Sequence, residues 1–142
     1  MADVPMRIEL DFKGYYTKRK NLLEGSGIYC VYTCVEHGKT VSLSNLVYVG
    51  ESGTVRQRVS NHELFDEWKR QRASGEVLCY SVASISPTST RQRAEAAVIF
   101  QHKPRVNDEY IHSFPFDTTA IAITGRVDLL TPSFTVLRDV ED

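Results

Sequence analysis

The chain is poor in cysteine, has no long apolar run and carries no strong excess of one charge. Three cysteines among 142 residues, an odd count without C-x-x-C spacing, suit a reducing compartment and provide no disulfide framework. Cys30 and Cys34 would lie about 13 Å apart on one strand, which is too far for a disulfide. We therefore expect all three cysteines to be free and buried.

Other absences exclude whole classes of protein. No run approaches the roughly 20 apolar residues that a membrane-spanning helix needs, and residues 1–5 lack the basic and apolar segments of a signal peptide. The sequence has no Walker or Rossmann glycine pattern, no G-x-S-x-G elbow and no zinc spacing of histidines and cysteines. We expect a cytoplasmic protein without membrane association or nucleotide cofactor.

Charge is nearly balanced, with a formal net charge of −1, which by itself argues against nucleic-acid binding. The distribution is uneven, because residues 109–142 contain six acidic residues and two arginines, a net −4 that leaves +3 on residues 1–108. Basic residues gather in the runs 18–20, 69–72 and 91–93. Charge alone leaves two explanations open for these runs, a solvated surface and a nucleic-acid contact.

Apolar periodicity predicts a single α+β domain of 142 residues. Alternating and β-branched segments predict strands, and possible capping boxes at Thr54 and Ser89 predict two helix starts. The expected strands are residues 7–12, 28–35, 46–49, 77–85, 118–124 and 134–137, and the expected helices are residues 54–72 and 90–101. The sheet should be small and antiparallel with helices packed on it, a loop of about ten residues after the central strand, and an extra C-terminal β-hairpin.

Six residues with chemically useful side chains stand out against this pattern. Each also has a purely structural explanation, since strand tyrosines usually pack in cores and a half-buried glutamate on the second helix could pair with an arginine on the first. The arginine and the histidine lie four residues apart on the first predicted helix, so their side chains should meet on one face of it. The six residues are Tyr29, Tyr48, Arg58, His62, Glu95 and Asn107.

In this order the six residues resemble the motifs of the GIY-YIG nuclease family. Gly27-Ile28-Tyr29 resembles the first motif, and Tyr48-Val49-Gly50 the second, with valine in place of its middle isoleucine. The resemblance covers residues 27–108 and leaves an N-terminal extension, residues 1–26, and a tail, residues 109–142. It implies a GIY-YIG-like layered domain. Glu51 departs from the pattern, because many members have a basic or polar residue there, and an inward-pointing acid would repel phosphate.

The resemblance implies an endonuclease that hydrolyses DNA phosphodiester bonds with one divalent ion, Mg²⁺ or Mn²⁺. Glu95 would hold the ion, because a single carboxylate with several waters suits Mg²⁺. Arg58 would bind the phosphate, and Tyr29 would be the general base if its phenolate is stabilised. Tyr48 and His62 would assist Tyr29 or relay the proton.

Asn107 would orient a strand end or a phosphate. The alternative function is a catalytically degenerate nucleic-acid-binding or interaction module of the same fold, which the net charge of −1 and the lack of an attached recognition domain favour. In a nuclease, DNA would be recognised by its shape and not its base sequence, or through a protein partner that confers specificity. With a charge of +3 on the matched residues, affinity should fall with salt with a slope on the order of three released ions. The oligomeric state stays open.

Overall fold

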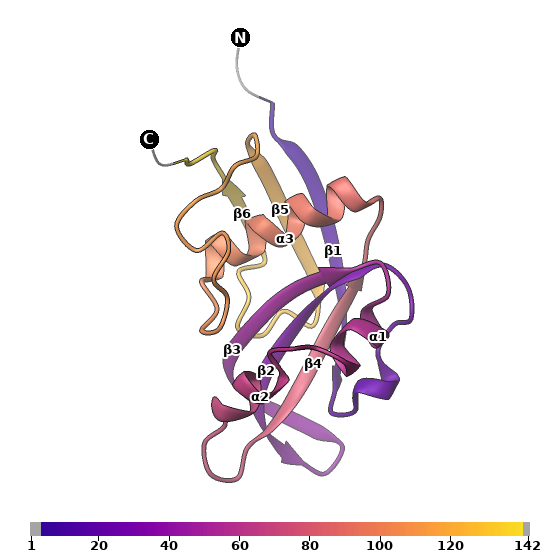
Figure 1. Ribbon diagram of the computed structural model, residues 1–142. Helices are drawn as coiled ribbons and strands as arrows, with labels where there is room; N and C mark the ends of the chain where they lie inside the picture. Colours follow the sequence, from indigo (N-terminus) through magenta and orange to yellow (C-terminus); the bar gives the residue numbers. More distant parts are fainter. Residues whose placement is uncertain (1–3, 141–142) are drawn as a thin grey trace.

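Figure 1 shows the computed structural model, which describes residues 4–140. Residues 1–3, part of the segment considered for a signal peptide, and two acidic residues of the tail, Glu141 and Asp142, lie outside the described residues. The elements are β1 (Met6–Tyr16), η1 (Arg19–Asn21), β2 (Gly27–His37), β3 (Thr40–Ser52), α1 (Val55–Ser60), α2 (Phe65–Arg70), β4 (Val77–Ser84), α3 (Thr88–His102), β5 (Thr119–Gly125) and β6 (Ser133–Val136).

The six strands form one sheet in the order β3-β2-β4-β1-β5-β6. β2 runs antiparallel between β3 and β4, and its residues 27–34 are all buried. This confirms the prediction of a central strand that is apolar on both faces. β5 and β6 pair in antiparallel register, which confirms the C-terminal hairpin. The coarse α+β class is therefore correct.

The sheet is mixed, so the prediction of a purely antiparallel sheet is wrong. β1 pairs in parallel with β5 over seven residue pairs, from Met6–Thr119 to Phe12–Gly125. α3 follows β4 and crosses the sheet, and the chain then returns on the far side of β1 (Figure 1). The alternation of apolar residues could not reveal this, because alternation reports burial and not strand direction.

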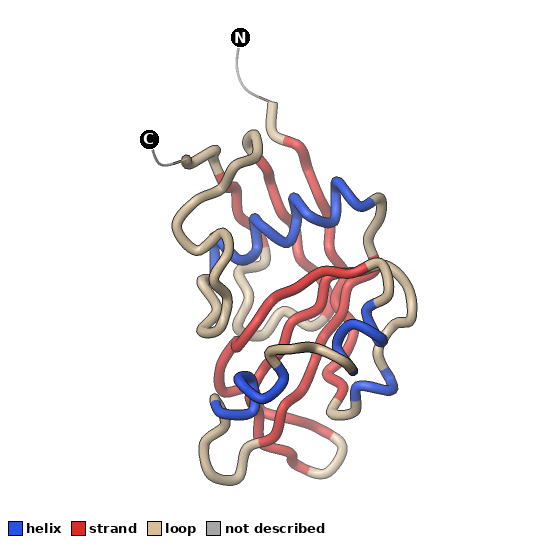
Figure 2. The backbone as a smooth tube through the Cα atoms, viewed as in Figure 1, coloured by secondary structure: helices blue, strands red, loops and turns tan. Residues whose placement is uncertain are grey.

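Helices cover both faces of the sheet. Consecutive strand residues point to opposite faces, so Ile28 packs in the core beneath α3 with Val98, whereas Tyr29 packs in the core beneath α1 and α2 with Trp68. In Figure 2, α3 crosses the upper half of the molecule, and the two short helices lie over its lower half. The first strand motif therefore directs its tyrosine toward α1 and α2.

The predicted helix over residues 54–72 is interrupted and forms the separate helices α1 and α2. The break contains His62, whose backbone carbonyl accepts the amide of Phe65 at 3.2 Å and whose Nδ1 accepts the amide of Leu64 at 3.0 Å. These bonds satisfy amides at the start of α2, which have no partners within the helix. His62 therefore does not follow Arg58 on one helix face, contrary to the prediction.

Two predictions about loops and helix ends are also wrong. β2 and β3 are joined by a tight turn and not a loop of about ten residues, because His37 pairs directly with Thr40 and Gly38 provides a positive φ of 64°. The first residues of β3, from Thr40 to Ser44, alternate between polar and apolar side chains, which is itself a strand pattern and marks the strand as longer than residues 46–49. Neither Thr54 nor Ser89 caps a helix through its side chain, and α3 begins before Ser89.

The predictions made from composition agree with the structure where it bears on them. The three cysteines, Cys30, Cys34 and Cys79, are free and buried, and they pack in the core beneath α3. No helix within residues 4–140 is long and apolar enough to cross a membrane.

Candidate functional site

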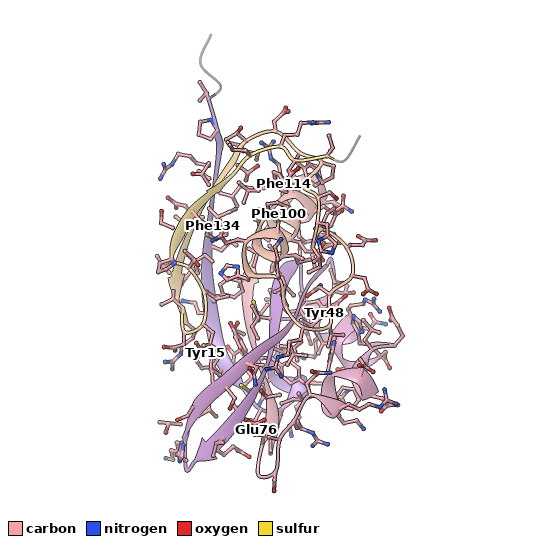
Figure 3. All side chains as sticks on the ribbon, turned by 90° about the vertical axis from the view of Figure 1, so that its left-hand side faces the viewer. Tyr15, Tyr48, Glu76, Phe100, Phe114 and Phe134 are labelled. Carbon is pink, nitrogen blue, oxygen red and sulfur yellow. The ribbon has the colours of Figure 1, made fainter. Side chains whose placement is uncertain are left out.

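A cleft of about 490 Å³ contains five of the six residues singled out in the sequence, Tyr29, Tyr48, Arg58, Glu95 and Asn107. They come from β2, β3, α1, α3 and the segment that follows α3. Figure 3 shows Tyr48 on β3, between the part of the molecule covered by α3 and the part covered by α1 and α2. The remaining lining residues are Gly50, Glu51, Glu63, Leu64, Ile99, Val106, Asp108 and Glu109.

Tyr29 lies at the base of the cleft, with its ring packed directly on Gly50. The two residues are partners in the register of β2 and β3. A Cβ atom at position 50 would lie 2.3 Å from the Tyr29 hydroxyl oxygen and 2.4 Å from its Cζ. Position 50 therefore requires glycine for space and not for backbone freedom. Gly50, the last residue of the second motif, thus positions Tyr29, the last residue of the first motif.

Both tyrosine hydroxyls hold their protons firmly. Burial raises the pKa of Tyr29 above its ordinary value, and Tyr48 and Glu95 act in the same direction, while Arg58 opposes them. Burial and then Glu95 raise the pKa of Tyr48 to about 12. A general-base role for Tyr29 therefore requires additional positive charge in the cleft.

His62 does not line the cleft but packs behind it against aromatic rings. Its ring centroid lies 5.2 Å from that of Tyr48 and 4.4 Å from that of Trp68. Burial, and then Arg58, lowers the pKa of His62 to about 4, so the ring is neutral near pH 7. Because Nδ1 accepts the Leu64 amide, the proton is on Nε2, which is buried without a partner in the described part of the chain. The ring can donate a hydrogen bond but has no free acceptor for a proton relay.

The guanidinium of Arg58 is occupied by a carboxylate that the sequence analysis overlooked. Nη1 and Nη2 donate to the two carboxylate oxygens of Glu63 at 2.6 and 2.9 Å, and Arg58 lowers the pKa of Glu63 to about 2. Arg58 is thus paired with Glu63 and not with Glu95, which was the structural explanation considered above. A phosphate would bind the same fork and compete with Glu63. The assumption of an unbroken helix hid this pair in the sequence.

Glu95 is half-buried on α3 and forms no ion pair with any residue that the structure describes. Burial first, and then the carboxylates of Glu51 and Glu109, raise its pKa to about 8, while the Glu51 amide and Arg91 act in the opposite direction. Such a carboxylate gains from either a proton or a cation. Residues 4–140 contain no group of three or more potential metal-ligating side chains, so a cation here would retain most of its water ligands.

The acid at position 51 is neutralised within the fold. Its carboxylate forms an ion pair with Arg91 of α3, and Arg91 also donates to Ser26 Oγ at 2.8 Å. The neighbouring Arg93 donates to Thr119 Oγ1 at 2.7 Å. Two of the basic side chains noted in the sequence therefore stabilise contacts of α3. The partners of these arginines lie 26 to 65 residues away in the sequence, which is too far for a sequence motif to indicate the contacts.

Asn107 completes the exposed edge of β3, the first strand in the sheet order. Its Nδ2 donates to the carbonyl of Val49 and its Oδ1 accepts the Val49 amide, both at 2.9 Å. The adjacent Val106 amide donates to the carbonyl of Val47, also at 2.9 Å. These bonds substitute for a neighbouring strand on both sides of Tyr48. Of the two roles considered for Asn107, the observed contacts favour orientation of a strand end.

The lining of the cleft is acidic, since it contains five acidic residues and one cation, Arg58, and only two of the five, Glu51 and Glu63, are paired with an arginine. An excess of negative charge repels a phosphate until cations are bound. The five acidic residues are Glu51, Glu63, Glu95, Asp108 and Glu109.

Comparison with known proteins identified no relative: a scan against family models, a search of curated proteins and a search of solved structures each found no match. Functional inference therefore starts from the side chains of this cleft.

Gly50→Ala should lower the free energy of unfolding by about 1–3 kcal/mol, because the new methyl group overlaps the Tyr29 hydroxyl. Urea unfolding of the variant and the parent measures the difference. Gly53→Ala is the matched control, since no atom lies within 4 Å of its added Cβ. Equal stability of all three proteins would contradict the packing of Tyr29 on Gly50.

Glu95→Gln should stabilise the metal-free protein at alkaline pH. The raised pKa of about 8 means that folding favours the protonated carboxyl, so the stability it provides is complete below about pH 4.5 and is lost as pH rises toward 8. Glutamine mimics the protonated form at every pH. The variant should match the parent near pH 4 and exceed it by up to a few kcal/mol at pH 8.5. Parallel stability–pH curves from urea unfolding would show that Glu95 does not titrate in this way.

Proposed function

We propose that the chain is a metal-dependent endonuclease of the GIY-YIG type that hydrolyses DNA phosphodiester bonds in the cleft around Glu95. The observation that carries the proposal is the convergence of Tyr29, Tyr48, Arg58 and Glu95 from four separate elements on one cleft. The structural explanations available for each residue alone do not require the four to meet. Phosphodiester hydrolysis does require a base, a phosphate ligand and a metal-binding carboxylate within one site.

Glu95 fits a divalent cation such as Mg²⁺ or Mn²⁺. Its carboxylate has no ion-pair partner among the described residues, and its pKa is raised to about 8 by burial and by neighbouring acids. When bound, the ion would supply Lewis-acid stabilisation of the leaving oxygen. Glu95 would release its proton on binding the ion.

The remaining residues would act on the water and the phosphate. Tyr29 would accept the proton of the attacking water at its hydroxyl oxygen once positive charge in the cleft has favoured its phenolate. Tyr48, stacked with Tyr29 at a centroid distance of 6.3 Å, would assist it. Arg58 would exchange the carboxylate of Glu63 for the non-bridging phosphate oxygens, with the same two donors. His62 would support Tyr48 through ring contact, and Asn107 would hold β3 in position.

A non-cutting binding module is the second candidate function. It is favoured by the occupied fork of Arg58 and by the acidic lining of the cleft. Incubation with plasmid, with and without Mg²⁺ or Mn²⁺, separates the two candidates. Metal-dependent nicking supports the nuclease, whereas a gel shift without nicking supports the module.

Glu95→Gln and Tyr29→Phe should each reduce plasmid nicking by orders of magnitude while leaving the fold intact, as judged by circular dichroism. The first change removes the charge that would hold the cation, and the second removes the hydroxyl that would accept the proton. Tyr48→Phe should cause a smaller loss, because Tyr48 only assists. Parental nicking by Glu95→Gln would exclude the proposed mechanism.

Glu63→Gln should increase the affinity for DNA, because a neutral amide competes less well than a carboxylate for the Arg58 guanidinium. We expect KM to fall several-fold with little change in kcat. Glu67→Gln is the matched control, since Glu67 also pairs with an arginine, Arg70, but lies outside the cleft lining. A loss of activity confined to Glu63→Gln would instead mean that Glu63 holds Arg58 in its working position.

A further inference from the structure

A second cleft, of about 550 Å³, lies on the other side of the short helices from the acidic cleft. One part of its lining is the segment 17–20, which follows β1 and enters η1. Another comes from Ser60 of α1, from α2 and from Arg72 just after α2, and β4 contributes the rest. Its lining residues are Thr17, Lys18, Arg19, Lys20, Ser60, Phe65, Lys69, Arg72, Val77, Leu78 and Tyr80. We call it the basic cleft.

The basic cleft is lined by five cations and no acidic residue. The cations come from two of the basic runs in the sequence, 18–20 and 69–72, which lie about 50 residues apart in the chain and line the same cleft here. The third run, 91–93, is used inside the fold, as shown above. The runs 18–20 and 69–72 therefore meet in one concave surface, and four of the five cations that they contribute to it form no ion pair within residues 4–140.

Most of these cations are free to bind an external anion. Lys18, Lys20 and Arg72 are exposed, and within residues 4–140 neither they nor Arg19 form an ion pair. Lys69 alone is paired, with Asp66 at 3.1 Å. In the acidic cleft, by contrast, the one lining cation is held by a carboxylate. Four of the five positive charges of the basic cleft are thus without an ion-pair partner among the described residues, and they lie in one place.

An aromatic residue fixes two of the cations. The guanidinium of Arg19 lies 3.9 Å from the Phe65 ring centroid and donates to the Ser60 carbonyl at 3.3 Å, and the Lys69 ammonium lies 4.8 Å from the same ring. Because cations already occupy the ring, Phe65 cannot serve as a stacking platform for bases. The groups of this surface that are then available to phosphate oxygens are the remaining exposed cations, Lys18, Lys20 and Arg72.

The two clefts share one face of the sheet. Tyr29 of the acidic cleft and Tyr80 of the basic cleft belong to the same core, the one covered by α1 and α2. α1 contributes Arg58 to one cleft and Ser60 to the other. An extended polyanion could therefore pass over the short helices and occupy both clefts at once.

We propose that the basic cleft binds the phosphodiester backbone of DNA a few nucleotides away from the phosphate that enters the acidic cleft. The identity of the polymer rests on the proposed function; the anion-binding surface does not. The acidic cleft repels phosphate, so affinity has to come from another surface, and the basic cleft supplies it. Contacts to phosphates alone give binding that is independent of base sequence and sensitive to salt.

Titration of a fluorescent DNA duplex in EDTA tests the proposal without any cutting. The double variant Lys18→Ala/Lys20→Ala, and the same variant with Arg72→Ala, should lose about tenfold or more in affinity at low salt, with the salt slope falling by about one per lost phosphate contact. Arg7→Ala/Lys39→Ala is the matched control, because it removes the same charge at exposed positions that line neither cleft. Parental affinity in the Lys18/Lys20 variant, or equal losses in the control, overturns the proposal.

Competitors identify the class of polymer. Unlabelled DNA should displace the labelled duplex from the parent far better than polyglutamate of equal charge. Preference for polyglutamate would replace the proposal with an acidic protein partner, and preference for duplex RNA, tested in the same way, would replace DNA by RNA. Metal-dependent nicking is scored separately. If the variants lose binding but the parent does not nick DNA, the basic cleft stands and the nuclease is rejected. If the parent nicks DNA but the variants bind as the parent does, the nuclease stands and the basic cleft is rejected.

Discussion

The contact between the Tyr29 ring and the backbone at Gly50 determines the geometry of the acidic cleft. Because position 50 carries only hydrogen, the Tyr29 ring lies directly over its β3 partner and its hydroxyl reaches the cleft that Tyr48 also lines. β3 is an edge strand, and its position is held from the open side by the two Asn107 bonds to Val49. The cleft is thus built on backbone that is fixed on both sides, which favours precise placement of side chains.

The two clefts carry opposite charge, which the formal net charge of −1 for the whole chain does not reveal. Carboxylates collect around Glu95, whereas cations collect around Arg19 and Phe65. Net charge describes the whole surface, but binding depends on local potential. The value of −1 therefore argues less strongly against nucleic-acid binding than it does when the sequence is considered alone.

The sequence predicted most of the strands and five residues of one cleft, because both leave local patterns. β2 is buried on both faces and shows a continuous apolar and aromatic run, and the motif residues keep their order along the chain. What it could not predict depends on contacts between distant segments. The parallel pairing of β1 with β5 and the ion pair of Glu51 with Arg91 have no local signature.

The prediction of one continuous helix over residues 54–72 led to two errors, the position of His62 and the partner of Arg58. Good helix formers on both sides predicted continuous helix, and propensity is a weak guide when a tertiary contact competes with it. The imidazole is buried against Trp68, and its Nδ1 accepts an amide, which interrupts the helix. The same interruption brings Glu63 to Arg58, so the ion pair between these two residues was hidden by the same assumption.

In the proposed enzyme, metal and substrate would each favour binding of the other. Without a cation, the Glu95 carboxyl is largely protonated near pH 7, because burial and then the carboxylates of Glu51 and Glu109 raise its pKa to about 8. A cation on Glu95 would reverse the negative potential of the cleft and make exchange of Glu63 for a phosphate on Arg58 more favourable. By linkage, a phosphate on Arg58 would strengthen cation binding by the same factor. An acidic cleft is then compatible with nuclease function, because it keeps the site unreactive toward phosphate until the cation arrives and leaves retention of the DNA to a surface outside the cleft.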